Sequence, residues 1–448
     1  MKVYSILAFT VLFPSVVFGQ GLFESASSIT NDGESKNFNY KLSGYVRGTS
    51  YFGKVYNADN YEVKSAYGEA ALIIKAAKSS LGSFNAEIRF RSGFEYGKSI
   101  NEFELREAFI TRSLGKLDLK FGKQIVVWGK ADGFNPSNNI TPNNGVVRSP
   151  NPDDLNIGNI LLRANYQINK TLELEGIYVP VYRSSIMSYD LLPWPEGSYL
   201  GSPVLPEPTI ENGSFALKFK YNGAKADFSL SALEGYDILP GMYLTDFVLN
   251  PDYSTETTIA SRSYRDRIIG FDFSTSMYSF GIRGEAAYKN ILGEDRNQYY
   301  SPLSEFYYVL GIDRSFGDFS CIVQYIGKYI QDYMELSPPV ETGQPQEYVE
   351  YELAKVNRLY FQQSREVLHS VSVRPALNLF YDKLTIDCFG LYNISTEEFM
   401  IRPQLSYNIA DAMKLSVGGE YFNGNPETLY KLISPIFNSV FVELRMSF

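Results

Sequence analysis

The amino-acid sequence predicts an all-β protein: a single transmembrane antiparallel β-barrel of about 16–18 strands, with 18 preferred. Three observations lead to this prediction. Segments that alternate polar and apolar residues recur along the chain, the connections between them alternate between short and long, and the chain ends on such a segment. Short periplasmic turns on one rim and long extracellular loops on the other are typical of outer-membrane barrels.

The C-terminal segment SVFVELRMSF (439–448) shows the alternation most clearly. Val440, Val442, Leu444, Met446 and Phe448 fall on one face of an extended strand, because successive side chains of a strand point to opposite sides. A closed barrel leaves no free edge in lipid. We therefore expect this last strand to pair with the first one.

Similar segments occur throughout the chain after residue 38, for example FNAEIRF (84–90) and FALKFKY (215–221). Polar and glycine-rich breaks between them predict short turns at 79–82, 113–116, 168–170, 222–225, 315–318, 381–383 and 408–412. Longer polar connections are predicted near 130–157, 184–212 and 236–263. Both chain ends then lie on the short-turn rim, which requires an even number of strands.

The N-terminus has the pattern of a secretory signal peptide. Lys2 precedes an apolar stretch that ends at the small residue Gly19, and a polar segment follows. We therefore expect a signal peptide at 1–19, a short periplasmic extension at 20–37 and the barrel at 38–448. No later apolar run is long enough for a membrane-spanning helix.

Composition argues against an enzyme and against a nucleic-acid partner. The net charge of −9 disfavours binding to nucleic acid, which is itself negatively charged. The chain has a single histidine, His369, so that metal triads and Ser–His–Asp groups within it all depend on one residue. We predict no catalytic residues, no metal site and no cofactor. The acidic pair Asp153-Asp154 is interpreted as solvated loop charge in preference to a cation site.

Residues 105–142 contain a more specific pattern. Leu105-Arg106-Glu107-Ala108 is followed by Gly122-Lys123-Gln124, Trp128-Gly129, Ala131-Asp132-Gly133 and Asn135-Pro136. This pattern resembles a family of bacterial outer-membrane barrels of unassigned function whose members often accompany RND-type exporters. The resemblance implies an outer-membrane location and a role linked to transport, with an exporter as a possible partner and no established substrate.

Alternation predicts which side chains of the first five strands line the lumen. The predicted pore-lining residues are Arg47, Glu69, Glu87, Arg89, Arg91, Arg106, Lys120 and Gln124. Charges in a lumen are hydrated, whereas on the lipid face each one costs several kcal/mol. Since we expect these arginines to be largely unpaired, we predict a basic lumen with a mild preference for anions.

Two charges break the alternation. By their positions in the alternation, the side chains of Glu107 and Lys123 would point to the lipid, on the two strands joined by the turn at 113–116. A three-residue turn would place them opposite each other as a cross-strand ion pair. Paired bulges that rotate both side chains inward are the alternative.

Four residues are predicted at the mouth of the barrel or in its loops: Trp128, Asp132, Trp194 and Phe247. Trp128 ends a strand, where an indole suits the membrane interface and the pore mouth equally well. Trp194 and Phe247 belong to two unusually apolar connections, 184–208 and 237–250. These connections either form a surface that binds a ligand or bury their apolar side chains against each other as a lid.

The sequence therefore favours a porin-like channel for small anionic solutes, which are amphipathic if the two apolar connections contact them. Its partners are outer-membrane lipid and the solute, and the oligomeric state stays open. The alternative is a non-transport outer-membrane protein, such as an adhesin or an accessory component of an export machine. A lumen filled by the long loops and closed to ions would distinguish this alternative.

Overall fold

The structure is a computed structural model that describes residues 38–54, 60–187, 194–293, 299–339 and 344–448. The predicted signal peptide and N-terminal extension lie outside the described residues.

Eighteen strands form one antiparallel sheet that closes into a barrel, which confirms the predicted fold class and the preferred strand number. Each strand pairs with the next along the chain, and β1 pairs with β21 to close the sheet. The first nine strands are β1 (Asn39–Lys54), β2 (Tyr61–Lys78), β3 (Gly82–Glu95), β4 (Lys98–Leu114), β5 (Leu117–Gln124), β6 (Asn159–Gln167), β7 (Leu172–Val179), β9 (Ser214–Asn222) and β10 (Ala226–Tyr236). The other nine are β13 (Arg265–Met277), β14 (Phe280–Ile291), β15 (Glu305–Phe316), β16 (Phe319–Ile330), β17 (Val367–Leu379), β18 (Leu384–Asn393), β19 (Glu398–Ala410), β20 (Met413–Asn423) and β21 (Ser439–Ser447).

The two faces of the sheet differ in polarity as the alternation predicts. On β1, Leu42 and Val46 are exposed on the outside, whereas Tyr45, Arg47 and Thr49 are buried inside. An apolar outer face against lipid and a polar inner face are the arrangement expected of a transmembrane barrel.

The C-terminal strand pairs with the first strand, as expected. Val440, Val442, Leu444 and Met446 are exposed on the outer face of β21. The backbone of Phe448 exchanges two hydrogen bonds of 2.9 Å with that of Gly44. The last residue of the chain therefore belongs to the ladder that closes the barrel.

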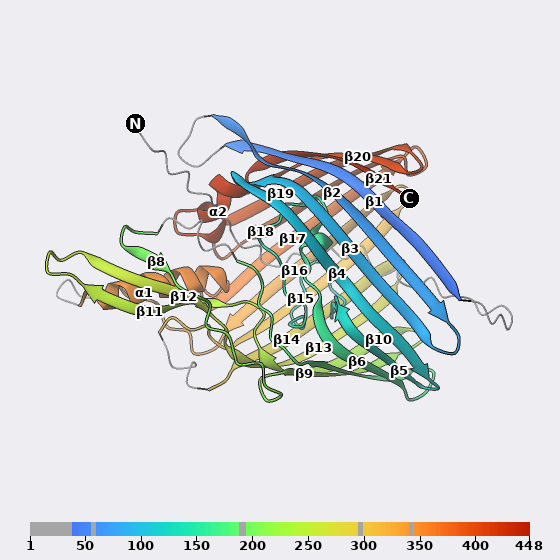
Figure 1. The fold of residues 1–448 in the computed structure, drawn as a ribbon, viewed down its shortest axis with the longest axis horizontal. Coiled ribbons are helices and arrows are strands. Elements are labelled where there is room, and N and C mark those ends of the chain that lie inside the picture. The colour runs from blue at the N-terminus through green and yellow to red at the C-terminus, as the bar shows by residue number, and fades with distance from the viewer. Residues whose placement is uncertain (1–37, 55–59, 188–193, 294–298, 340–343) are drawn as a thin grey trace.

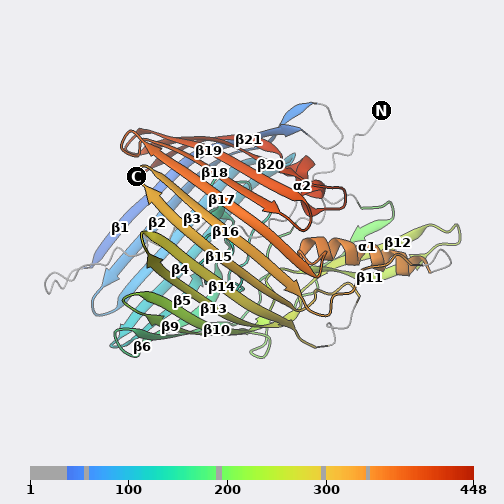
Figure 2. The same ribbon diagram turned by 180° about the vertical axis from the view of Figure 1, so that it is seen from behind.

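Structure outside the barrel wall gathers at the end with the long connections, which is the extracellular end by the rule for outer-membrane barrels. A three-stranded sheet of β8 (Ser198–Leu200), β11 (Gly241–Leu249) and β12 (Thr255–Arg262) packs with the helix α1 (Pro345–Tyr360). Figures 1 and 2 show this unit projecting beyond the barrel. A second helix, α2 (Leu429–Phe437), connects β20 to β21 and packs against β19 and β20. Within the described ranges, no helix is long and apolar enough to cross a membrane.

The predicted ion pair between Glu107 and Lys123 is wrong. The turn between β4 and β5 has two residues, since Leu114 pairs with Leu117, and this places Ala108 opposite Lys123. The register on the other side of β4 shifts as well, because Glu107 pairs with Glu87 and Leu105 with Ile88. Arg106 is the extra residue of this β-bulge.

Candidate functional site

The connection from β5 to β6, which we call the lumen loop (residues 125–158), folds into the barrel instead of covering its mouth. It leaves the wall at the bulge of β4, where the backbone N–H of Ile125 donates to the Glu107 carboxylate at 2.8 Å. The Thr141 hydroxyl donates to the Val126 carbonyl at 2.7 Å and accepts from the Val126 N–H at 2.9 Å, which closes the neck of the loop. The motif at 105–142 thus marks the strand ends and the loop that departs from them.

Glu285 of β14 holds the first half of the lumen loop. Its carboxylate accepts the backbone N–H of Lys130 at 3.1 Å, the backbone N–H of Ser137 at 2.8 Å and the Ser137 hydroxyl at 2.7 Å. The neighbouring Arg283 forms an ion pair of 2.7 Å with Asp132. Hydrogen bonds to an ionised group are the strong ones in proteins, so this is a firm anchor on one wall.

Gly129 is required where the loop meets Glu285. Its φ is +116°, and a Cβ placed there would lie 2.3 Å from the nearer Glu285 carboxylate oxygen. We expect Gly129→Ala to displace this carboxylate and to lower the free energy of unfolding by about 2–4 kcal/mol, since backbone strain adds to unsatisfied donors. Urea-induced unfolding in detergent measures the effect. Gly115→Ala is the matched control, because Gly115 has a φ of +63° with no atom within 4 Å of its would-be Cβ; an equal loss in both variants would contradict the close contact.

Trp128 and Asp132 lie in the lumen loop, inside the barrel; of the two predicted places, the mouth or a loop, the structure has the loop. Trp128 is buried in a cluster of apolar residues from the lumen loop and from β6, β7, β9, β10, β13 and β14. Its indole N–H donates to Glu175 at 3.3 Å, and the Lys218 ammonium lies 5.4 Å from its ring. These partners draw the amphipathic ring into the lumen.

Arg148 anchors the second half of the loop on the opposite side of the lumen. Its buried guanidinium pairs with Glu420 of β20 at 2.6 Å and donates to the Ser439 hydroxyl at 2.8 Å. It also lies 4.7 Å from the ring centre of Tyr51. The Tyr67 hydroxyl donates to the Arg148 carbonyl at 2.8 Å, so that both backbone and side chain are held.

The predicted unpaired arginines are in fact paired, and a residue of the loop is one of their partners. One Asp154 carboxylate oxygen lies 2.7 Å from Arg47, and the other lies 2.8 Å from Arg89. Arg106, the bulge residue, donates to the backbone carbonyls of Asp153, Asp154 and Asn156. The interpretation of Asp153-Asp154 as solvated loop charge is wrong for Asp154, which is buried.

Burial by itself raises the pKa of Asp154, but the guanidiniums of Arg47, Arg89 and Arg106 outweigh it and hold the pKa well below its usual range. A depressed pKa stabilises the docked loop at every pH above the ordinary carboxyl value, and this contribution is lost only as the pH falls through the depressed value. The ion pairs therefore persist at neutral and mildly acidic pH.

The predicted pore-lining residues occupy the inner face of β1–β5. Six are buried there: Arg47, Glu69, Arg89, Arg91, Arg106 and Gln124. Glu87 and Lys120 are half-buried. Glu69 pairs with Arg47 at 2.6 Å and with Arg91 at 2.9 Å, while Glu87 pairs with Arg89 at 2.6 Å. The first three strands and the loop thus form one ion-pair network.

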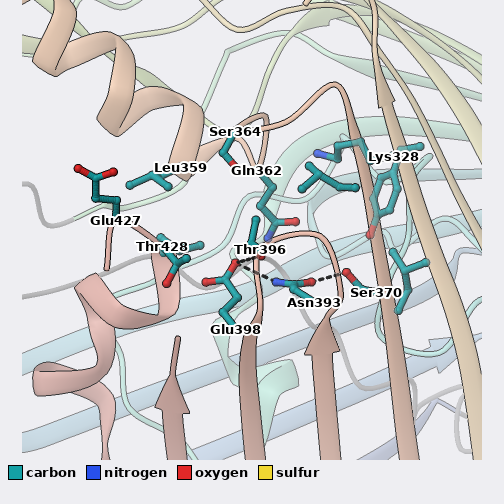
Figure 3. A pocket seen from close by; sticks show the side chains of 14 residues that line it. Lys328, Leu359, Gln362, Ser364, Ser370, Asn393, Thr396, Glu398, Glu427 and Thr428 are labelled. Atoms are coloured by element: carbon teal, nitrogen blue, oxygen red, sulfur yellow. Dashed lines mark hydrogen bonds between the residues drawn. The ribbon is translucent and has the colours of Figure 1, made fainter. Parts of the chain in front are cut away.

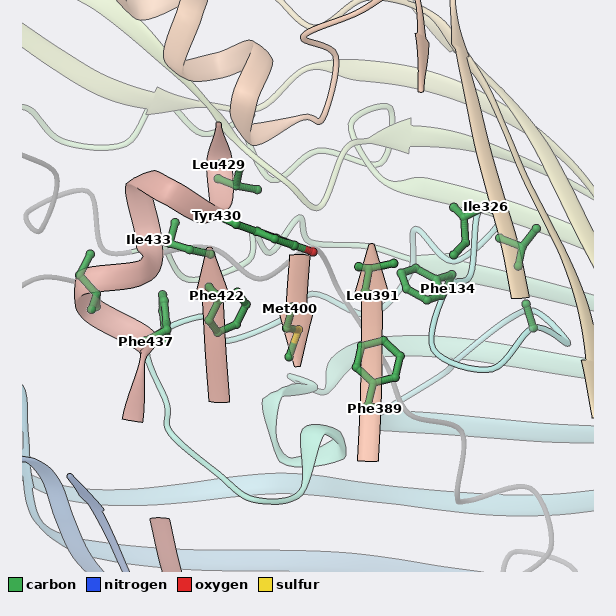
Figure 4. Close-up of a cluster of buried hydrophobic side chains, with 13 residues drawn as sticks. Phe134, Ile326, Phe389, Leu391, Met400, Phe422, Leu429, Tyr430, Ile433 and Phe437 are labelled. Atoms are coloured by element: carbon green, nitrogen blue, oxygen red, sulfur yellow. The ribbon is translucent and has the colours of Figure 1, made fainter. Parts of the chain in front are cut away.

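A second part of the lumen is apolar. The inner apolar cluster consists of Ala131, Phe134, Val309, Ile326, Phe389, Leu391, Met400, Phe422, Leu429, Tyr430, Ile433, Ile436 and Phe437. Figure 4 shows side chains of α2 directed toward Phe422 and Met400 on the neighbouring strands. Phe134 of the lumen loop reaches this cluster, and its ring centre lies 6.3 Å from that of Phe389.

Two cavities adjoin the inner apolar cluster. The extracellular cavity, of about 50 Å³, lies between the end of α1, the start of α2 and strands β15–β19 (Figure 3). It shares Ile326 and Leu429 with the cluster. In it, the Glu398 carboxylate accepts from Asn393 at 3.0 Å and from Thr396 at 2.8 Å.

The periplasmic cavity is larger, at about 730 Å³, and it shares Phe389 with the cluster. Residues 150–153 of the lumen loop line it, together with strands β17–β21. Its cationic side chains are Arg374, Arg402, Lys414 and Arg445, and its carboxylates are Asp153, Asp387, Asp411 and Glu443. Lys414 and Arg445 are cross-strand neighbours, and neither forms an ion pair with any carboxylate in the described part of the chain.

Trp194 and Phe247 lie in the unit that projects from the barrel. Both are half-buried against a cluster of Met242, Leu244 and Ile259 from the sheet and Leu353 from α1. The two apolar connections therefore bury side chains against each other, with α1 as a third partner.

The sequence pattern did not single out Glu285, Arg148 and Asp154 as the residues that anchor the loop. Glu285 is visible only as one polar residue on an alternating strand, and Arg148 as one charge in a long connection. The signal that was present is the density of Gly, Asn and Ser at 129–139, which fits a loop whose backbone must approach other groups closely. Among the described residues, no group of three or more His, Cys, Asp or Glu side chains could hold a metal ion.

Comparison with known proteins gives a family and a set of similar folds. A family profile described as a protein of unknown function, DUF1302, matches residues 18–292. The crystal structure of Pseudomonas aeruginosa OccK2 (OpdF) is similar, with a TM-score of 0.54 at 10% identity, over 92% of this chain and 97% of that chain. A structure of OccK2 in complex with glucuronate gives the same TM-score at 9% identity and the same coverage.

The crystal structure of a BenF-like porin from Pseudomonas fluorescens Pf-5 has a TM-score of 0.54 at 10% identity, over 93% of this chain and 99% of that chain. No curated protein matches the chain. At such identities the neighbours show the fold alone. A closed barrel with an apolar outer face, in a fold shared with porins, places the chain in the bacterial outer membrane.

Proposed function

The chain belongs to the DUF1302 family of proteins of unknown function, and we propose that it is an outer-membrane channel for small amphipathic solutes with an anionic group. The solute passes along the β16–β21 wall, beside the lumen loop. The observation that carries this proposal is the order of features along that wall: a small cavity, the inner apolar cluster and a large cavity with cationic side chains.

The inner apolar cluster supports an amphipathic solute. Hydrophobic constrictions exclude small ions because water leaves them. An apolar body loses no hydration by entering such a place, and it gains contact with Phe389, the member of the cluster that lines the periplasmic cavity. A fully hydrated ion or sugar must give up its water there.

The periplasmic cavity supports an anionic group on the solute. Lys414 and Arg445 lie side by side on β20 and β21, and the Arg445 guanidinium lies 3.9 Å from the ring centre of Tyr45. The cavity as a whole has as many acidic as cationic side chains. Lys414 and Arg445 form no ion pair with a described carboxylate, and two adjacent cations raise the local concentration of anions beside them. A barrel of similar fold has been crystallised with glucuronate, a sugar carboxylate, which supports the anionic group of the solute and not its apolar part.

The charges of the cavity provide the test. We expect the double variant Lys414→Glu with Arg445→Glu to lower the phenylacetate current through the purified barrel in planar bilayers about fivefold or more, since the cavity then repels anions. The matched control is Lys170→Glu, a charge reversal at an exposed turn on the same rim of the barrel but on another wall. An unchanged phenylacetate current in the double variant, with both proteins folded, would contradict the role of the cavity.

The second candidate is a non-transport outer-membrane protein, and one observation favours it. The lumen loop is anchored by Glu285 on one wall and by Glu420, Arg47 and Arg89 on the other. A loop held in this way could keep the lumen shut. Recordings from the wild-type barrel decide between the two, because the second candidate predicts no current for any solute.

A further inference from the structure

Asp154 binds the barrel wall in the way that a carboxylate ligand would. Its two carboxylate oxygens take one guanidinium each, Arg47 at 2.7 Å and Arg89 at 2.8 Å. The Ser149 hydroxyl donates at 2.6 Å to the same Asp154 carboxylate oxygen that binds Arg47. Two guanidiniums that share one planar carboxylate are a geometry suited to recognition of that group.

The two arginines are held in place by the wall and not by the loop alone. Glu69 lies 2.6 Å from Arg47, Glu87 lies 2.6 Å from Arg89, and Glu443 of β21 lies 3.4 Å from Arg47. These carboxylates fix the guanidiniums from the side of the sheet. The arrangement of Arg47 and Arg89 therefore does not depend on Asp154, although Asp154 fills it.

The site adjoins the periplasmic cavity. Residues 150–153, which directly precede Asp154, line the cavity, and so does Glu443, which contacts Arg47. Asp154, which binds Arg47 and Arg89, thus directly follows the part of the loop that lines the cavity.

We propose that Arg47 and Arg89 form a carboxylate-binding site which the lumen loop fills with its own Asp154, and that the carboxylate of the solute displaces Asp154 from it. This inference rests on the proposed function, because the displacing solute is the one that the channel carries. Displacement releases the Asp154 side chain from Arg47 and Arg89, while the hydrogen bonds from Arg106 to the backbone carbonyls of Asp153, Asp154 and Asn156 keep the segment beside the wall. The lumen loop thus carries a built-in competitor for the carboxylate of the solute.

Binding of phenylacetate to the purified full chain in detergent, measured by calorimetry, tests the inference. Asp154→Asn keeps the shape of the side chain and removes its charge. Without the internal competitor we expect phenylacetate to bind about tenfold tighter or more than to the wild type, because a site that is mostly filled lowers the apparent affinity in proportion. For inorganic phosphate, which is not planar, Asp154→Asn should give a smaller gain in affinity than it gives for phenylacetate.

Asp252→Asn is the matched control. Asp252 is exposed in the turn between β11 and β12, in the unit that projects from the barrel, so that loss of its charge should leave the affinity for phenylacetate within about twofold of the wild type. Equal affinities of the wild type and Asp154→Asn, or an equal gain in Asp252→Asn, would overturn the inference. An equal gain for phosphate would overturn the assignment to carboxylates.

The result can be separated from the proposed function. If the wild-type barrel carries phenylacetate current while Asp154→Asn binds no tighter, the inference fails and the channel stands. If the wild type carries no organic anion, the proposed function fails whatever the binding shows. If Asp154→Asn does not fold, Ser149→Ala serves in its place, because it removes one hydrogen bond from Asp154. We then expect phenylacetate to bind about threefold tighter than to the wild type. No gain would again overturn the inference.

Discussion

Replacement of the lumen loop by a two-residue Asn-Gly turn should raise the single-channel conductance in KCl about fivefold or more, because an 18-stranded barrel without a plug leaves an aqueous channel. The replacement is geometrically simple. Gln124 and Asn159, the strand ends that flank the loop, are cross-strand partners, and Asn-Gly is the preferred turn between such partners. Planar-bilayer recordings of both proteins measure the effect.

The control for this replacement is a loop of the projecting unit. Replacement of residues 250–254 between β11 and β12 by the same turn changes the protein outside the lumen. It should leave the conductance unchanged. A loop-deleted barrel that assembles normally and yet conducts no better than the wild type would show that the lumen loop does not limit the flow of ions.

Loss of Arg148 should cost the largest share of stability among single substitutions of the loop. Its guanidinium and the Glu420 carboxylate are both almost fully buried, and removal of one partner of such a pair typically costs about 3–5 kcal/mol. Glu420 keeps a contact of 3.1 Å with Arg402, which favours the lower end of this range. We expect Arg148→Met to lower the free energy of unfolding accordingly, as measured by urea titration in lipid vesicles.

Arg267→Met provides the comparison for Arg148→Met. Arg267 pairs with Glu234 at 2.5 Å, but the two side chains are 55% and 36% exposed, and Glu234 keeps a second partner in Arg265. A pair of this kind is worth less than about 1 kcal/mol. Equal costs of the two substitutions would indicate that Arg148 does not anchor the loop.

The sequence predicted the barrel because lipid imposes a local rule. A strand in contact with lipid must alternate, and the alternation is visible in any window of ten residues, as at 439–448. The strand number followed from counting the breaks between such windows. The same rule predicted that the side chains of Arg47, Glu69, Arg89 and Arg91 lie on the inner face of their strands. All four are buried inside the barrel.

The register between β4 and β5 could not be predicted, because it depends on a turn length and a bulge that alternation does not reveal. A turn of two residues instead of three shifts the partner of Lys123 by one position. Glu107 and Lys123 then serve the strand ends: Glu107 accepts the N–H of Ile125, and the Lys123 ammonium donates to the Leu105 carbonyl. The two charged residues that break the alternation thus lie where the lumen loop leaves the barrel wall.

The pairing of the arginines could not be predicted either, because their partner is distant in the sequence. Asp154 lies 107 residues from Arg47, and Arg148 lies 272 residues from Glu420. Nothing in a single sequence tells a loop that crosses a lumen from one that covers its mouth. The association with an exporter and the oligomeric state stay predictions.

Single-channel recording from the purified wild-type barrel tests the central claim most directly, with sodium phenylacetate compared with sodium gluconate. The two anions carry the same charge but differ in their apolar part. If an amphipathic anion passes the inner apolar cluster, phenylacetate should give discrete current steps several-fold larger than those of gluconate. No current with either anion in the wild type, while the barrel without its lumen loop conducts both, would contradict the account and leave a closed outer-membrane protein.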